Sequence, residues 1–278
     1  MSELTIILGL LQTVIVLGVG HIIFVVIMKQ KNNQLYRLML MISICALIQN
    51  AAYILELYST NVAEALVSIR MYYLGGAFVA TLFLFLTRMY CGYTTSKKIF
   101  TILVLFNVLV IFSVWTCEFN PLYYTSVDFV TDAPLPHVVL GKGILYLCYA
   151  AVNLTLIIVC VVTAGISVKR ATDIKQKKTL LLLMCSSIIP FLSYIIGATG
   201  IWGGYDPVPC ATGIGVILFS FIAFYQHSFD LVEIAHENIV QTMDEAIIIV
   251  DDQYGFTEAN EKAILIFPEL KFYERERT

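Results

Sequence analysis

The chain has 278 residues, of which 59% are hydrophobic and only 13% are charged, and its formal net charge is −3. This composition is more apolar than that of ordinary water-soluble domains and excludes such a domain as the main fold. The small net charge does not indicate a nucleic-acid partner, and we expect none.

Seven apolar stretches follow one another, each about long enough to cross the ~30 Å hydrocarbon layer of a bilayer at 1.5 Å per residue. The first lacks a basic segment before it, so we expect an uncleaved anchor rather than a signal peptide. We predict an all-α membrane protein, a seven-transmembrane-helix bundle over residues 1–229. The predicted spans are 4–28, 38–57, 65–87, 99–115, 141–168, 179–200 and 208–225.

Basic residues are confined to alternate connections between these spans. The connections after the first, third and fifth spans hold eleven lysines and arginines, and those after the second, fourth and sixth hold none. Positive residues stay on the cytoplasmic side of a membrane. The N-terminus is therefore predicted outside, and everything after the seventh span in the cytoplasm.

The long outer connection, 117–140, contains two short β-prone runs around a Pro/Asp turn. This pattern predicts a short hairpin over the outer mouth of the bundle. Cys117 and Cys210 are both predicted at the outer surface, where a disulfide between them is one possibility, but the sequence gives no distance between them.

The chain changes character after residue 229. Val232, Ala235, Ile239 and Met243 recur at helical spacing and predict an amphipathic linker helix over 230–243, suited to pairing with a second copy. Within 244–278, the runs 246–250 and 256–259 are expected as strands, and Asn260 as the cap of a following helix. So short a segment cannot complete an α+β domain, so we expect a fragment or a truncated product.

Several motifs, in this order, resemble one family: RMYYLG at 70–75, NPLYY at 120–124, the basic cluster at 170–178, Pro190, and DPVP at 206–209. Over 38–263 the chain resembles the N-terminal seven-helix sensor region of bacterial sensor histidine kinases, and 243–263 looks like the start of a PAS domain.

The resemblance implies a homodimeric, multi-pass sensory input module of the bacterial cytoplasmic membrane. A small-molecule or membrane stimulus would pass through the seventh span and the linker helix to a PAS domain and an output domain, which is absent from this chain. By resemblance the output is a histidine kinase, with a diguanylate cyclase as the alternative. The chain itself carries no kinase signature and is not expected to be an enzyme.

Charged side chains within spans cost at least ~2.5 kcal/mol near a helix centre, so the few present are candidate site residues. Glu56 and Arg70 are expected at similar depth near the outer surface. Either they form an ion pair that clamps two helices, or Arg70 faces an outer cavity and binds an anionic or polar ligand. Lys142 and Tyr73 lie near the same surface, and each is explained by interfacial anchoring or by contact with a ligand.

Two prolines have predicted structural or signalling roles. Asp206 and Pro207 are expected as the cap and first residue of the seventh helix. Pro190 is expected to kink the sixth helix, as a hinge or a static bend.

Val232 and Ile239, on the predicted linker helix, are assigned to signal transfer. We expect no metal site and no cofactor, because the seven cysteines form no CxxC pair.

Other seven-span or multi-span classes are less well supported. A retinal protein requires a lysine in the last span, and 208–226 contains none. The basic residue at the inner end of the third span is explained as a cytoplasmic flank rather than as part of a G-protein-coupled receptor. A small transporter or channel remains an alternative, although Gln49, Asn50, Asn107 and Asn153 are scattered rather than paired.

Overall fold

The computed structural model describes residues 3–29, 34–94, 96–131, 133, 135–171, 174–199, 201, 203–221, 245–250, 256–267 and 269. The chain forms two compact units, Met1–Ile222 and Ala223–Thr278.

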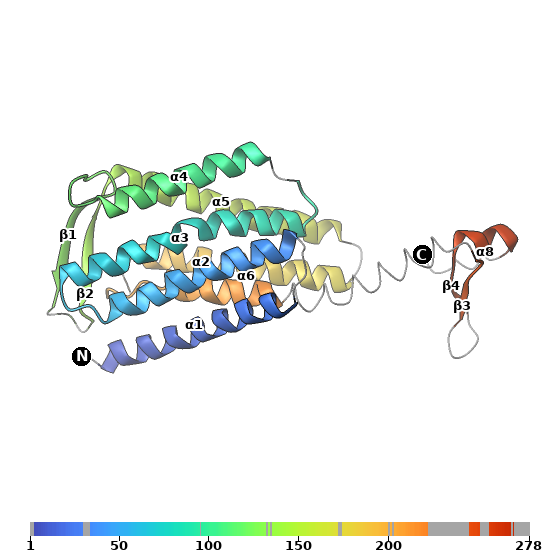
Figure 1. Cartoon of the computed structure of the whole chain (residues 1–278), viewed down its shortest axis with the longest axis horizontal. Coiled ribbons are helices and arrows are strands. Elements are labelled where there is room, and N and C mark those ends of the chain that lie inside the picture. Colours follow the sequence, from blue (N-terminus) through green and yellow to red (C-terminus); the bar gives the residue numbers. More distant parts are fainter. Residues whose placement is uncertain are drawn as a thin grey trace. The chain divides into compact units, whose positions relative to one another are not determined.

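The first unit is a bundle of long helices (Figure 1). Within the described residues, six helices are long and apolar enough to cross a membrane, which confirms six of the predicted spans. The seventh prediction is represented by the shorter apolar helix Val208–Phe221, and its remaining residues, 222–225, lie outside the described part. The six long helices are α1 (Glu3–Lys29), α2 (Gln34–Leu57), α3 (Val62–Tyr90), α4 (Lys97–Trp115), α5 (Ile144–Arg170) and α6 (Ile174–Ala198).

Helix α3 is the centre of the bundle. It contacts α2, α4 and α5. In its apolar 18-residue stretch, 61% of the residues are buried inside the protein, against 17% in the corresponding stretch of α5. Its contact with α2 is very close, because a Cβ atom added at Gly75 would lie 2.1 Å from the carbonyl oxygen of Cys45. Only glycine permits this approach of two helix backbones.

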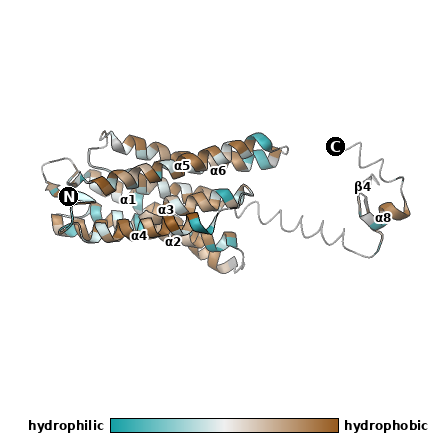
Figure 2. Ribbon diagram, turned by 90° about the horizontal axis from the view of Figure 1, so that it is seen from above, coloured by the Kyte–Doolittle hydropathy of each residue, from teal (hydrophilic) through white to brown (hydrophobic). Residues whose placement is uncertain are grey.

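The outer helices present apolar side chains to their surroundings. On α1, Leu10, Val14 and Leu17 are all more than 60% exposed, and on α4 so are Ile102 and Phe112. The hydrophobic colouring of the bundle is visible in Figure 2. Water does not tolerate so large an apolar surface, so lipid tails must cover it.

The strands β1 (Tyr124–Val130) and β2 (His137–Lys142) pair antiparallel, which confirms the predicted hairpin. The hairpin and the start of α1 lie at the same end of the bundle (Figure 1). Strand β2 continues to Lys142, so α5 begins at Ile144 and not at residue 141 as predicted. The reason is pairing of Tyr124 with Lys142, which keeps this segment extended.

The second unit contains β3 (Ile248–Val250), β4 (Phe256–Ala259) and α8 (Glu261–Ile266), in the order predicted from the sequence. The two strands pair antiparallel. Asn260 caps α8, because its Oδ1 accepts hydrogen bonds from the N–H groups of Ala263 at 2.9 Å and Ile247 at 3.0 Å. The predicted linker helix at 230–243, with Val232 and Ile239, lies outside the described residues.

Candidate functional site

A cavity of about 550 Å³ lies among the helices and reaches the hairpin. Its walls come from α2, α3, β2, α5, α6, the segment before the last helix and the last helix itself. Its polar or charged lining residues are Gln49, Glu56, Tyr72, Tyr73, Lys142, Tyr146, Tyr149, Asn153, Ser187, Tyr194, Tyr205, Asp206 and Thr212.

The cavity is elongated along the bundle. Tyr72 and Phe83 both line it and are eleven positions apart on α3, a distance of about 16 Å at 1.5 Å per residue. The charged residues and most of the tyrosines belong to the hairpin end. The other end is lined mainly by the apolar residues Val79, Ala80, Phe83, Ile157 and Cys160.

Tyrosines attach the hairpin to the cavity wall. The hydroxyl of Tyr73 on α3 accepts hydrogen bonds from the hydroxyls of Tyr123 at 2.9 Å and Tyr124 at 3.2 Å. The rings of Tyr73 and Tyr123 meet edge to face with centroids 5.3 Å apart. Burial raises the pKa of Tyr123 and of Tyr124, so both hydroxyls remain protonated donors at physiological pH.

Asp206 is held at the start of the last helix by two backbone contacts. Its Oδ1 accepts a hydrogen bond from the N–H of Val208 at 2.9 Å, and its own N–H donates to the hydroxyl of Tyr53 at 2.6 Å. The carbonyl of Pro207 accepts from Ala211 N at 3.1 Å, so the helix begins one residue later than predicted. Burial raises the pKa of Asp206 to about 6, although the Val208 N–H and the charge of Lys142 act in the opposite direction.

Glu56 and Lys142 complete the charged part of the lining. Glu56 belongs to the last turn of α2, and Lys142 ends β2 with an exposed side chain. The Nζ atom of Lys142 lies 5.3 Å from the centroid of the Tyr146 ring. Among the described residues, no ion pair joins Glu56, Lys142 or Asp206 to another side chain.

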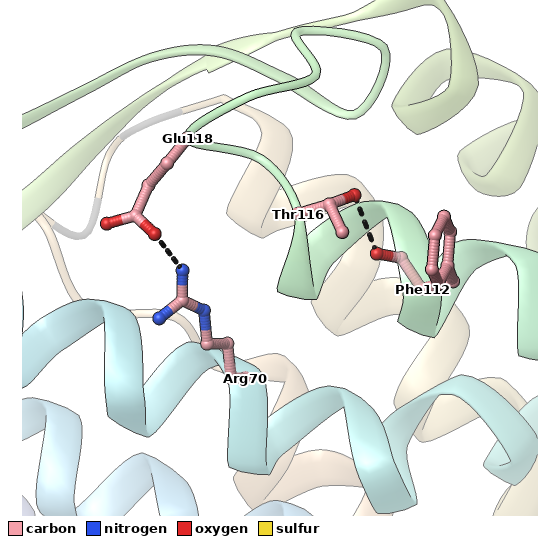
Figure 3. Close-up of polar contacts among 4 residues, drawn as sticks. All are labelled: Arg70, Phe112, Thr116 and Glu118. Atoms are coloured by element: carbon pink, nitrogen blue, oxygen red, sulfur yellow. Dashed lines mark hydrogen bonds and ion pairs between the residues drawn. The ribbon is translucent and has the colours of Figure 1, made fainter.

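Arg70 has a different partner from the one predicted. Its Nη2 lies 2.6 Å from Oε2 of Glu118 (Figure 3), so the predicted Glu56–Arg70 ion pair is wrong. Glu118 follows α4, whose end is closed by a hydrogen bond from the Thr116 hydroxyl to the carbonyl of Phe112 at 2.9 Å. Arg70 is also absent from the described lining of the cavity, whereas Glu56 belongs to it.

Polar residues of α2 join the last helix to the cavity. The side-chain N–H of Gln49 donates to the Tyr72 hydroxyl at 2.8 Å, and the hydroxyl of Thr212 donates to Gln49 Oε1 at 3.2 Å. Asn50 accepts a hydrogen bond from Gln12 of α1. Gln49 and Asn50, which are scattered polar residues in the sequence, thus have hydrogen-bond partners on other helices of the bundle. Gln49 connects Tyr72 of α3 with Thr212 of the Val208–Phe221 helix.

Residues 10–232 match the family described as the N-terminal 7TM region of histidine kinase. The chain belongs to this family. It is therefore a membrane sensory input module, as the resemblance implied, and its multi-pass bundle contacts the lipid bilayer. A comparison with curated proteins finds no match.

The match to the histidine kinase 7TM region includes the hairpin, the whole cavity and the last helix, and it ends before residue 244. Cys117 and Cys210, which the sequence left open as a disulfide, are both free thiols within this region. Pro190 lies inside α6, as predicted, and it lines the cavity.

The sequence analysis missed the α5 wall of this 7TM region, although a signal was present. Tyr146, Tyr149, Asn153, Ile157 and Cys160 all line the cavity and recur at intervals of three or four residues. That spacing places them on one face of a helix. A polar and aromatic face on an otherwise apolar span predicts an interior surface rather than a lipid contact.

Proposed function

We propose that this module senses a small molecule in the cavity and transmits its presence to a histidine kinase through the Val208–Phe221 helix. One observation carries the proposal: Val208 and Thr212 of this last helix are themselves part of the cavity wall. A ligand shifts an equilibrium between two arrangements only if it binds them differently. An occupant that touches this helix directly is in a position to do so.

The proposed orientation places the hairpin end outside the cell and the chain after the last helix in the cytoplasm. The distribution of basic residues supports it. Single cysteines at Ser126 in β1 and at Lys98 in α4, on a cysteine-free background, test it by labelling intact cells with a membrane-impermeant reagent. We expect labelling at Ser126 alone, and labelling at Lys98 before permeabilisation would contradict the orientation.

Downstream of the bundle, we propose a linker helix at 230–243 that pairs with a second copy through Val232 and Ile239, followed by the start of a PAS domain. The order of β3, β4 and α8 supports the PAS assignment. A one-residue insertion at Asn238 would rotate everything after it by about 100°, whereas seven residues restore the face. In a fusion to a complete kinase, we expect the first insertion to change autophosphorylation strongly and the second to preserve it.

The cavity itself is tested by filling it. Ala150 lines the cavity, whereas its neighbour Ala151 on α5 is exposed on the outside of the bundle. In the same kinase fusion, Ala150→Phe should shift autophosphorylation severalfold, because the added ring occupies ligand space. Ala151→Phe adds the same ring outside and should leave autophosphorylation unchanged. If Ala150→Phe is folded and also leaves it unchanged, the cavity has no part in sensing.

A further inference from the structure

Acidic side chains outnumber basic ones in the described lining of the cavity. Glu56 and Asp206 line its polar end together with Lys142, which is the single basic residue among the described lining residues. Arg70, the other nearby cation, is bound to Glu118. An anionic ligand would therefore meet two carboxyl groups and only one ammonium group.

The aromatic lining also favours a cation. Six tyrosines face the cavity: Tyr72, Tyr73, Tyr146, Tyr149, Tyr194 and Tyr205. The face of an aromatic ring carries partial negative charge and attracts an ammonium group within about 6 Å of its centroid. Lys142 already shows this contact, since its Nζ lies 5.3 Å from the Tyr146 centroid. Because the Lys142 side chain is exposed, it is free to leave the ring when another cation arrives.

The length of the cavity adds a requirement for an apolar body. Beyond the tyrosines the walls are mainly aliphatic and aromatic, ending at Phe83 and Cys160. A small cation such as tetramethylammonium would fill the polar end and leave the apolar end without contacts. A ligand with a charged head and an apolar chain would bury surface over the full length of about 16 Å.

We infer that the cavity binds a singly charged organic ammonium compound with an elongated apolar body, its cation beside Glu56 and Asp206. This inference rests on the proposed sensory role of the same cavity and adds the chemical class of its ligand.

The first test is a calorimetric titration of the purified chain in a maltoside detergent, whose head group is uncharged. The probe is octyltrimethylammonium, with octyl sulfate and tetramethylammonium as matched compounds. We expect octyltrimethylammonium to bind, tetramethylammonium to bind at least about tenfold more weakly for lack of the chain, and octyl sulfate to show no saturable binding. Saturable binding of octyl sulfate as tight as that of the cation would overturn the inference.

Three variants test the charge of the ligand, and each has a different expected effect on binding. The double variant Glu56→Gln/Asp206→Asn should weaken binding of octyltrimethylammonium by about tenfold or more, since it removes charge-assisted contacts. Asp128→Asn, an exposed carboxyl group on β1 outside the lining, should not change it. Lys142→Gln should strengthen binding severalfold, because a competing cation is removed. Weaker binding of octyltrimethylammonium to Lys142→Gln would mean that Lys142 does not compete with the cation for the carboxyl groups, and would overturn the inference.

The probe also distinguishes an aqueous from a bilayer source of the ammonium compound. Octyltrimethylammonium added in solution is compared with hexadecyltrimethylammonium incorporated in the lipid of nanodiscs. If the two compounds share one site, each displaces the other. Binding of the short probe from solution assigns an aqueous ligand, and binding of the long one alone assigns a membrane amphiphile.

The experiments distinguish a wrong ligand class from a wrong sensory role for the cavity. If none of the ammonium probes binds but Ala150→Phe still changes autophosphorylation in the kinase fusion, the cavity is sensory and takes another ligand. If neither result is obtained, both proposals fall.

Discussion

Helix α3 takes part in two regions that are built in opposite ways. Where it crosses α2, Gly75 lies against the carbonyl of Cys45 with no room for a single added carbon atom. Beside that contact, Tyr72, Val79 and Phe83 of the same helix border a cavity of about 550 Å³. The cavity is therefore no sign of a loosely packed bundle. Its walls are fixed by tight contacts and by tyrosine hydrogen bonds, which makes it a preformed cavity.

The tight region should be the more sensitive of the two. Gly75→Ala places a Cβ 2.1 Å from a backbone oxygen that cannot rotate away, so we expect a loss of about 1–3 kcal/mol in stability. Thermal unfolding in detergent measures it. Gly20→Ala on α1 is the matched control, since nothing lies within 4 Å of its added Cβ. Equal melting temperatures for the two variants would show that α2 and α3 do not meet this closely.

In the cavity wall, by contrast, removal of the Asp206 charge should be tolerated and should even raise the stability of the folded protein. The pKa of Asp206 is raised from 3.8 to about 6, so the folded state holds its proton more firmly than the unfolded state. Stability associated with this group is full below pH 3.8 and is lost as the pH rises through about 6. Asp206→Asn keeps the oxygen that accepts from Val208 but cannot ionise.

We therefore expect Asp206→Asn to melt a few degrees above the unmodified chain at pH 8 and at the same temperature near pH 4. The exposed Asp128→Asn should show neither effect. A variant that is less stable at pH 8 would mean that the Asp206 charge is favourable in the folded protein, contrary to its burial.

The smallest effect is expected at the Arg70–Glu118 ion pair, which lies outside the cavity. Glu118 remains 53% exposed, and exposed pairs contribute about 0.2–1 kcal/mol. A double-mutant cycle of Arg70→Ala and Glu118→Ala, followed by thermal unfolding, should give a coupling energy in this range. The cycle of Arg70→Ala with Glu56→Gln should be additive, and coupling there instead would restore the pair that the sequence suggested.

The sequence predicts features that depend on neighbouring residues and misses those that depend on helix rotation. The apolar runs, the β-prone segments on both sides of residues 131–134 and the cap at Asn260 are local, and the structure confirms them. The depth of a residue in the membrane also follows from its position along its own span, and for this reason the sequence predicts Glu56 and Arg70 at a similar depth. The direction in which each side chain points is not local, because it depends on how α2, α3 and α4 pack together.

The same limitation explains why the sequence did not predict the residues that line the cavity. Tyr73 and Lys142 were recognised as lying near one surface, but nothing in the sequence joins them to Tyr194 or Asp206, which follow much later. Their meeting requires α5, α6 and the last helix to be assembled around α3. Only the periodic face of Tyr146, Tyr149 and Asn153 carried advance information, because three residues on one helix need no tertiary contact to be related.

Helix α6 and the last helix approach each other closely at Pro190 and Gly215. Pro190 has no N–H to offer the carbonyl of Ser186, and a Cβ added at Gly215 would lie 2.8 Å from that carbonyl and 3.3 Å from the proline ring. Since Pro190 also borders the cavity, this close contact between α6 and the last helix lies beside the cavity, within one turn of Thr212. A change in the width of the cavity here would act directly on the backbone of the last helix, because Gly215 has no side chain between that backbone and α6.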